Sequence, residues 1–405
     1  MKVAQVNVSD FGSTGRIMLQ IRDRLKKEGH ECICFYGRGR EPDASDKVLM
    51  EGKMSVYCHA AKARLFDKMG HGSTAATKKL VERLEQEKPD ILHLHNIHGY
   101  YLDMRVLFDW IKKTDIKTVW TLHDCWAFTG GCAYFLDCGC EKWRTGCRSC
   151  PQTGNYPKRY SDHCDREYEL KKGLFNGVGH MILTTPSEWM AGLVKQSFLS
   201  PYEVIAVPNG IDTGVFYPRN DEERLEARKK LGISDKDKMV LAVANVWDER
   251  KRLGAFEQLA KALEPRGVKS VVVGVTEAQK KDLSGAVTAL TRTENQQQLA
   301  ELYSAADLFV STSVEESFSL VVAEALASGT PVVTADGGGC SELISEDTGL
   351  IVPRDDGEAL LKAAEQILFD GKDYTGACRD RCLNNYSLDH MLDGYMEVYG
   401  RLYGG

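Results

Sequence analysis

The stretch Glu316-Ser317-Phe318-Ser319-Leu320-Val321-Val322-Ala323-Glu324 places two glutamates eight positions apart, with a largely apolar run between them. It follows the short apolar segment Leu308–Ser311, which is typical of a buried strand. We expect a turn at the first glutamate and a helix that begins near Ser317 and carries the second. Eight positions on a helix return to nearly the same face, so both acids can point into one cleft.

The beginning of that helix is suited to binding an anion. Its first backbone N–H groups lack partners within the helix and lie at the positive end of the helix dipole, which suits a diphosphate. The residues expected there are Ser317, Phe318, Ser319 and Leu320. Glu324, further along, can accept hydrogen bonds from both hydroxyls of a ribose. The spacing therefore predicts a nucleotide site or, equally, a surface acid and a helix acid with no shared role.

The rest of the chain alternates short apolar segments with longer amphipathic stretches, which predicts parallel sheets covered by helices. The expected strands are Val3–Val8, Cys32–Tyr36, Ile91–His95, Thr118–Leu122, Met181–Thr185, Met239–Ala244, Ser270–Val275, Leu308–Ser311 and Pro331–Thr334. A Gly-rich turn at residues 12–15 and then a helix should follow the first strand. Ser187 is expected to cap a helix that begins near Glu188.

Two consecutive series of strand–helix units meet at the turn Pro208-Asn209-Gly210. A chain of 405 residues also exceeds one ordinary hydrophobic core. We therefore expect an α/β fold with two Rossmann-like domains, at residues 1–209 and 210–385. Residues 386–405 are expected to form a C-terminal helix, by the periodicity of their apolar side chains.

The composition is that of an ordinary globular protein, with 43% hydrophobic and 27% charged residues. The net charge of −6 argues against a nucleic-acid-binding protein. The sequence contains no apolar run of about 18 residues and no signal-peptide pattern at its start, so we expect a cytoplasmic protein. The segment from Lys53 to Arg83 contains seven Lys or Arg residues but only two acidic residues. This surplus fits peripheral contact with the anionic inner face of the plasma membrane or, equally, a solvated helical face.

The stretch from Glu316 to Glu324, two glutamates separated by seven residues, is an E-x7-E pattern. It is followed by Ala325-Leu326-Ala327-Ser328-Gly329-Thr330-Pro331-Val332-Val333 and by three glycines at 337–339. Further motifs are Trp120-Thr121-Leu122-His123-Asp124, Val207-Pro208-Asn209-Gly210-Ile211-Asp212, Trp247-Asp248-Glu249-Arg250-Lys251 and Ser304-Ala305-Ala306-Asp307. Over essentially the whole chain, these motifs resemble those of family 4 glycosyltransferases. Within that family the sequence is most similar to bacterial enzymes of capsular and colanic-acid-type exopolysaccharide assembly. The resemblance implies the GT-B fold, in which two Rossmann-like domains face a central cleft. It also implies that the C-terminal helix at residues 386–405 returns to the N-terminal domain.

The resemblance also implies a role for each matching residue. Glu316 would lie beside the hydroxyls of the donor sugar, and Glu324 would bind the ribose. Lys251 would hold the donor diphosphate and supply a cation where charge develops on the leaving group.

The sequence departs from the family pattern at Asn245, six residues before Lys251, where the family usually has an arginine. An amide can donate hydrogen bonds but carries no charge. Either Arg250 or Arg252 compensates, or the donor is bound more weakly. The loop around Arg292 would contact the base, and it does not decide between UDP and GDP. We favour UDP because it is the commonest donor nucleotide in the family.

In the N-terminal domain, Gly15 is expected where the diphosphate approaches the backbone, because a side chain would block the amides. Arg16 would add charge there or decorate the helix surface. His123 follows a strand end, where ligands bind in open α/β sheets. The resemblance implies that His123 is a catalytic residue that faces the donor sugar and the acceptor, and the alternative is a structural histidine hydrogen-bonded to Asp124.

Three further residues follow a neighbouring strand, namely His95, Asn96 and His98. We expect them to line the acceptor side of the site. The alternative is a metal cluster, although His-x-His at a strand end is common without a metal.

The resemblance implies a hexosyltransferase-type enzyme (EC 2.4) that retains the anomeric configuration and uses no metal or other cofactor in catalysis. The leaving phosphate oxygen would take the proton of the acceptor hydroxyl. The expected donor is a UDP-sugar, and the expected acceptor is a polyprenyl-diphosphate-linked sugar or another glycan. Asp235-Lys236-Asp237 matches the Asp-x-Asp of metal-dependent transferases, but we expect it on a solvated loop. A nucleotide-sugar epimerase of the same fold and a non-catalytic nucleotide-sugar-binding scaffold are the alternatives.

A loop at residues 125–164 is rich in cysteine. Five of its cysteines lie within a span of nineteen residues, namely Cys132, Cys138, Cys140, Cys147 and Cys150. The last two form a Cys-x2-Cys half-site, which Cys132 and Cys140 could complete as a structural zinc site. Cys138 would then be spare. An iron–sulfur cluster and plain reduced thiols are the alternatives.

Overall fold

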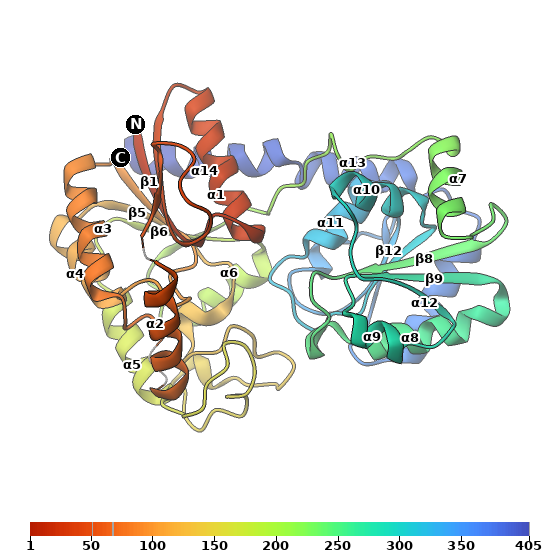
Figure 1. The fold of residues 1–405 in the computed structure, drawn as a ribbon, viewed down its shortest axis with the longest axis horizontal. Helices are drawn as coiled ribbons and strands as arrows, with labels where there is room; N and C mark the ends of the chain where they lie inside the picture. Colours follow the sequence, from red (N-terminus) through yellow and green to blue (C-terminus); the bar gives the residue numbers. More distant parts are fainter. Residues whose placement is uncertain (51, 67–68, 405) are drawn as a thin grey trace. The chain divides into compact units, whose positions relative to one another are not determined.

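The chain divides into two compact units in the computed structural model, which describes residues 1–50, 52–66 and 69–404 (Figure 1). The first unit comprises Met1–Val207 and Leu392–Gly405, and the second comprises Pro208–Met391. Each unit is an α/β domain built around one parallel sheet with helices. Helix α14 (Leu388–Gly404) begins in the second unit and ends in the first.

The seven-stranded sheet of the first unit has the order β3-β2-β1-β4-β5-β6-β7. Its strands are β1 (Lys2–Ser9), β2 (Glu31–Arg38), β3 (Lys47–Leu49), β4 (Ile91–Leu94), β5 (Lys117–Thr121), β6 (Met181–Thr185) and β7 (Glu203–Ala206). The helices are α1 (Gly12–Lys27), α2 (Lys53–Phe66), α3 (Thr74–Glu87), α4 (Met104–Thr114), α5 (Cys164–Phe175) and α6 (Glu188–Val194). The strand order reverses between β1 and β4, and such a switch point is where open α/β sheets bind ligands.

The six-stranded sheet of the second unit has the order β10-β9-β8-β11-β12-β13. Its strands are β8 (Lys238–Val243), β9 (Val268–Val273), β10 (Val287–Leu290), β11 (Leu308–Ser311), β12 (Val332–Ala335) and β13 (Gly349–Val352). The helices are α7 (Asp221–Lys230), α8 (Leu253–Leu263), α9 (Glu277–Asp282), α10 (Gln296–Ala305), α11 (Leu320–Ala327), α12 (Gly357–Phe369) and α13 (Thr375–Asn385). The switch point here lies between β8 and β11.

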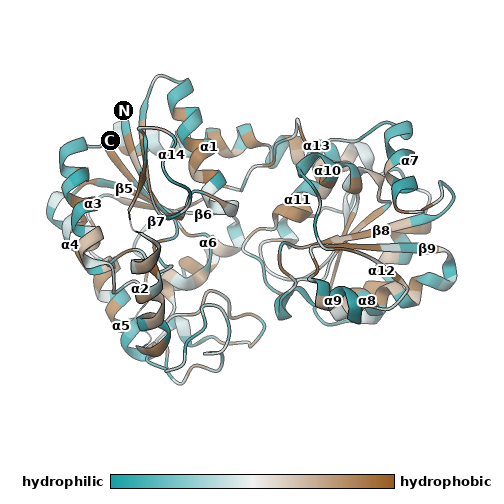
Figure 2. Cartoon of the chain, in the orientation of Figure 1, coloured by the Kyte–Doolittle hydropathy of each residue, from teal (hydrophilic) through white to brown (hydrophobic). Residues whose placement is uncertain are grey.

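The central strands are buried on both faces, which explains why they read as apolar runs. In Figure 2, these strands are mostly hydrophobic, whereas an outer helix such as α7 is mostly hydrophilic. The predicted helix after Ser187 is confirmed, because the Ser187 side chain accepts a hydrogen bond from the backbone of Met190. Within the described residues, no helix is both long enough and apolar enough to span a bilayer.

All nine predicted strands are present, and their ends differ from the predicted ones by at most two residues. Four strands were missed, namely β3, β7, β10 and β13. The predicted Gly-rich turn is wrong in one respect, because α1 already begins at Gly12 and residues 12–15 form its first turn.

Candidate functional site

Lys251 and Glu316 form an ion pair at the switch point of the second sheet. Lys251 ends a short 3-10 helix (Glu249–Lys251) after β8, and Glu316 follows the neighbouring strand β11. The Nζ atom of Lys251 donates to Oε1 of Glu316, and the two side chains are 19% and 15% exposed. The structure therefore brings together the two residues predicted to hold the diphosphate and the donor sugar.

The backbone of Glu316 is held by the glycine segment that the sequence motif singled out. The Glu316 N–H donates to the Gly337 carbonyl at 2.7 Å, and the Gly339 N–H donates to the Glu316 carbonyl at 2.8 Å. A Cβ atom on Gly337 would lie 2.5 Å from the carbonyl oxygen of Ser313. Glycine is therefore required at 337 for the segment to approach Glu316 this closely.

Helix α11 begins at Leu320, so the predicted start near Ser317 is wrong. Ser319 precedes the helix with φ 134° and ψ 92°, a backbone conformation that side chains disfavour. This residue interrupts the expected helix. Phe318 is buried and packs against the ring of Tyr386. Of the four predicted amides, only that of Leu320 belongs to the helix, and Ser317, Phe318 and Ser319 lie in the preceding loop.

Glu324 is buried on α11 and accepts a hydrogen bond from the Tyr303 hydroxyl at 3.0 Å. Burial and the neighbouring Glu324 carboxylate raise the pKa of Tyr303 well above its usual range, so the phenol keeps its proton and donates. Sequence reasoning missed Tyr303. The signal available was its position directly before the Ser304-Ala305-Ala306-Asp307 motif.

The remaining predicted donor residues lie at the ends of β8 and β10. Asn245 is exposed in the loop after β8. Arg250 donates to Asp248 at 3.0 Å and to the carbonyl of Glu315 at 3.3 Å, next to Glu316. Arg252 instead donates to Asp355 at 3.0 Å. The contacts therefore favour Arg250 over Arg252 as the substitute cation beside Glu316.

Arg292 is exposed in the loop after β10, an edge strand of the second sheet. None of the contacts described for the chain joins Arg292 to Lys251, Glu316 or Glu324. Its predicted contact with the base stays a prediction.

Replacing Asn245 with arginine is expected to lower the KM for the nucleotide donor severalfold. The new guanidinium would restore the cation that the family usually has, and charge-assisted hydrogen bonds to phosphate are stronger than those of an amide. Asn245 is exposed, so the fold should tolerate the change. Initial rates at varied donor concentration measure the effect. An unchanged KM would show that Arg250 already supplies the missing charge.

The predicted acceptor-side residues surround one small cavity in the first unit. A space of about 10 Å³ is lined by His95, Asn96, His98, His123 and Asp124, among others. The His95 Nδ1 atom lies 3.1 Å from Nε2 of His123, and the His98 Nε2 atom lies 2.9 Å from Oδ2 of Asp124. The alternative interpretation of His123 was a structural histidine hydrogen-bonded to Asp124. It is wrong about the partner, because His123 contacts His95 and Asp124 contacts His98. As placed, no three His, Cys, Asp or Glu side chains of the described residues could hold a metal ion.

Burial sets the protonation of these groups. It lowers the pKa of His93 to about 3 and that of His123 to about 4, and it lowers the pKa of His95 well below its usual value. Burial also acts to raise the pKa of Asp124, but the charge and hydrogen bond of His98 bring it below its ordinary value. At neutral pH His93, His95 and His123 are therefore neutral, and Asp124 is ionised.

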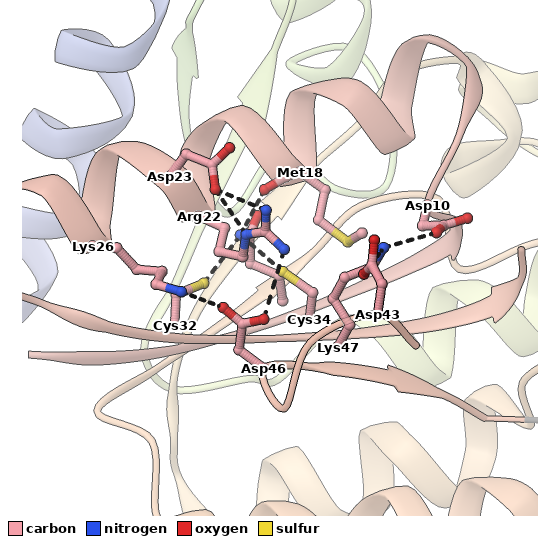
Figure 3. Close-up of polar contacts among 11 residues, drawn as sticks. Asp10, Met18, Arg22, Asp23, Lys26, Cys32, Cys34, Asp43, Asp46 and Lys47 are labelled. Carbon is pink, nitrogen blue, oxygen red and sulfur yellow. Dashed lines mark hydrogen bonds and ion pairs between the residues drawn. The ribbon is translucent and has the colours of Figure 1, made fainter. Parts of the chain in front are cut away.

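Gly15 and Arg16 lie in the first turn of α1, after β1. A Cβ atom on Gly15 would lie 2.5 Å from the carbonyl carbon of Asp10, so glycine is required for this turn to close. Asp10 is held by Lys47, whose Nζ atom lies between Asp10 and Asp43 (Figure 3). Arg16 is exposed. The predicted approach of a diphosphate to Gly15 stays a prediction, and the packing of the turn is a second reason for glycine there.

The cysteine-rich loop gathers several thiols around one cavity of about 20 Å³. The cysteines that line it are Cys132, Cys140, Cys147, Cys150 and Cys164. The Gly130 N–H donates to the sulfur of Cys147 at 3.1 Å, and Arg159 donates to the sulfur of Cys150 at 3.0 Å. Cys138 is exposed and donates to the Phe135 carbonyl. No disulfide joins any of the cysteines in the part of the chain that the structure describes.

Comparisons with known proteins agree with this arrangement. Residues 14–215 match the family model Glycosyltransferase Family 4, and residues 237–370 match the model Glycosyl transferases group 1. The chain is 24% identical to the putative colanic acid biosynthesis glycosyl transferase WcaC of Escherichia coli K12, over 99% of this chain and 100% of that protein.

Two solved structures share the fold over nearly the whole chain. Sucrose-phosphate synthase from Thermosynechococcus elongatus superposes with a TM-score of 0.73 at 20% identity, covering 100% of this chain and 99% of that one. Anabaena HepE in complex with UDP-glucose superposes with a TM-score of 0.67 at 15% identity, covering 99% and 100%. With two consecutive family models, a full-length relative and these folds, the chain belongs to glycosyltransferase family 4 and is a glycosyltransferase of the GT-B fold.

Proposed function

We propose that this enzyme transfers a sugar from a UDP-sugar to a glycan or lipid-linked acceptor in the assembly of a bacterial surface polysaccharide, with retention of the anomeric configuration. The observation that carries the proposal is the Lys251–Glu316 pair at the switch point between β8 and β11. The pair places a cation that can bind a diphosphate, Lys251, next to a carboxylate that can bind sugar hydroxyls, Glu316. Glu324, on the helix that follows Glu316, supplies the acceptor for a ribose.

In this mechanism, Lys251 stabilises the negative charge that develops on the departing diphosphate. Glu316 accepts hydrogen bonds from the donor sugar and fixes its orientation. The leaving phosphate oxygen takes the proton of the acceptor hydroxyl, so a separate strong base is not needed.

We propose that no metal ion takes part in catalysis. The Asp-x-Asp pattern at residues 235–237 lies in a surface turn before β8, where the Asp237 carboxylate accepts from the backbone N–H of Ser234 at 2.9 Å. The Asp237 carboxylate therefore stabilises this turn. The alternative source of charge stabilisation, Lys251, is present in the same unit.

UDP is the favoured donor nucleotide. Support comes from HepE, a protein of the same fold whose structure holds UDP-glucose. The colanic-acid relative supports an acceptor in exopolysaccharide assembly, and a polyprenyl-diphosphate-linked sugar is the proposed form.

The test is a panel of nucleotide sugars incubated with the purified protein and crude lipid-linked acceptor, with and without EDTA, scored by nucleotide release and by product anomer. Release from a UDP-sugar that survives EDTA, with a retained anomer, is the expected result. Conversion of the free donor without nucleotide release would favour an epimerase. Donor binding without turnover would favour a non-catalytic scaffold.

We also propose peripheral contact with an anionic membrane surface through α2 and the neighbouring part of the cysteine-rich loop. Five large hydrophobic side chains there are more than half exposed, namely Met54, Tyr57, Leu65, Tyr156 and Tyr160. The two segments are joined, because the Tyr160 N–H donates to the Arg64 carbonyl at 2.9 Å. Exposed aromatic and basic side chains together suit a lipid interface. Asp67 and Lys68, two residues of the basic segment, lie outside the described residues.

Sedimentation with vesicles tests this contact. Binding to vesicles that contain anionic lipid, and its loss in the Tyr57→Ser/Tyr160→Ser variant, is expected. Leu225→Ser, which removes an exposed apolar side chain from the second unit, is the matched control. Equal binding by both variants would contradict the assignment.

A structural zinc ion held by Cys132, Cys140, Cys147 and Cys150 remains a proposal. The four thiols line one cavity, and Gly130 and Arg159 donate hydrogen bonds to two of the sulfurs, as partners of thiolate ligands do. As placed, however, no three of these donors are close enough to bind one ion, so the thiols would have to turn inward. Zinc content measured for Cys140→Ser against Cys138→Ser decides, because only the first change should lower it.

A further inference from the structure

A chain of hydrogen bonds in the first unit runs from a helix carbonyl to His123. Gln5 donates from Nε2 to the Met18 carbonyl at 2.9 Å. Its Oε1 atom lies 3.0 Å from Nε2 of His95, whose Nδ1 lies 3.1 Å from Nε2 of His123. Gln5 and His95 are fully buried, and His123 is 9% exposed. The chain therefore links α1, β1, the end of β4 and the loop after β5.

The first link fixes the orientation of the Gln5 amide. A backbone carbonyl oxygen can only accept, so the NH2 group must face Met18. The sulfurs of Cys32 and Cys34 lie 3.3 and 3.7 Å from the same Nε2 atom. Figure 3 shows these two cysteines beneath the helix that carries Met18. The oxygen of the amide is therefore the atom that faces His95.

The second and third links fix two tautomers. Because the amide oxygen of Gln5 only accepts, Nε2 of His95 must carry the hydrogen. A neutral imidazole has one N–H, so Nδ1 of His95 is an acceptor, and Nε2 of His123 must donate to it. A neutral His123 then has no hydrogen on Nδ1.

Both rings are neutral at physiological pH. Burial lowers the pKa of His123 to about 4, while the charge of Asp124 acts to raise it and that of His98 to lower it. Burial, together with the neighbouring His93 and His123, lowers the pKa of His95 well below its usual value. With these contributions, the neutral forms of both rings dominate.

We propose that Gln5 and His95 are positioning residues that hold His123 in the Nε2–H tautomer, so that its Nδ1 is presented as a hydrogen-bond acceptor for a sugar hydroxyl. Within the described part of the chain, no group donates a hydrogen bond to this Nδ1 atom. A ring in this state orients a hydroxyl and does not donate a proton from Nδ1 to a departing oxygen. The sugar contact rests on the proposed function, whereas the tautomer rests on the hydrogen bonds alone.

Two variants of nearly equal size test the relay. His95→Asn keeps an amide oxygen near the position of Nδ1 and can still accept from His123, whereas His95→Leu cannot. Nitrogen-15 spectra of histidine-labelled protein report the tautomer directly, and the His123 signals are assigned by their loss in His123→Asn. The wild type and His95→Asn are expected to show the Nε2–H form of His123, and His95→Leu a mixture.

The transfer rates of the wild type, His95→Asn and His95→Leu are expected to fall in that order. The kcat/KM of His95→Leu is expected to fall about tenfold, the value of one hydrogen bond in the transition state, with partial rescue in His95→Asn. If His95→Leu does not fold, Gln5→Met removes the acceptor of the His95 N–H and is read by the same spectra. An Nδ1–H tautomer in the wild type would overturn the proposal, as would equal tautomers and rates in His95→Leu and His95→Asn. An Nε2–H tautomer in a protein that transfers no sugar would support the relay and contradict only the proposed function.

Discussion

Replacement of Lys251 by alanine is expected to lower kcat/KM for the sugar donor by about 10²–10³-fold, the cost of removing one group that stabilises charge on a leaving group. Its side chain is only 19% exposed and contacts Glu316. Because the free diphosphate of the product carries the charge that this cation stabilises, UDP binding should weaken as well. Initial rates and UDP titration calorimetry measure the two effects.

A second surface cation of the same unit provides the control. Lys261 on α8 pairs with Glu257 at 2.9 Å and is 53% exposed, far more than Lys251. Lys261→Ala should leave both kcat/KM and UDP binding within about twofold of the wild type, since exposed pairs contribute little. Near-normal turnover of Lys251→Ala would show that the diphosphate is held by another group, and Arg250 would be the next candidate.

The sequence was sufficient for the strands at the centre of each sheet but not for those at the edges. The four missed strands, β3, β7, β10 and β13, are the outermost strands of the two sheets. They are three or four residues long and only partly buried. Such a strand has a neighbouring strand on one side only, so it is less buried and lacks the continuous apolar run that marked the central strands.

The start of α11 illustrates a different limit. The run from Ser317 to Ala327 has no proline or glycine, and spacing alone allows a helix throughout. The chain instead passes through Ser319 at φ 134° before the helix begins. Tertiary contacts hold this conformation, among them the burial of Phe318 against Tyr386 and the bonds of Glu316 to the glycine segment. A local pattern cannot report contacts with residues so distant in sequence.

The candidate site was predicted mainly through resemblance, because spacing alone left Glu316 and Glu324 open to a plain surface interpretation. The resemblance supplied Lys251, which lies 65 positions before its partner Glu316. Tyr303 and Gln5 were missed for a common reason. Each is a buried polar residue that acts through a hydrogen bond, and its partner is visible only after folding.

Replacement of Glu316 by glutamine is expected to lower kcat by about 10²–10³-fold while strengthening the binding of free UDP. The carboxylate is proposed to orient the donor sugar, and an amide of the same size cannot accept from two hydroxyls in the same way. Free UDP carries no sugar, and its diphosphate competes with Glu316 for Lys251. Removing the competitor should tighten UDP binding up to about fivefold, which corresponds to the roughly 1 kcal/mol of a partly exposed ion pair.

The two variants of this ion pair are therefore expected to change the affinity for UDP in opposite directions. A general loss of folding cannot produce opposite changes. Lys251→Ala weakens UDP binding and Glu316→Gln tightens it, although both abolish most of the transfer. Glu358→Gln on α12 is the matched control, because Glu358 also pairs with a lysine, Lys362 at 2.7 Å, but is 78% exposed. It should change neither rate nor binding. Weaker UDP binding in Glu316→Gln would contradict the competition and would place the carboxylate on the nucleotide itself.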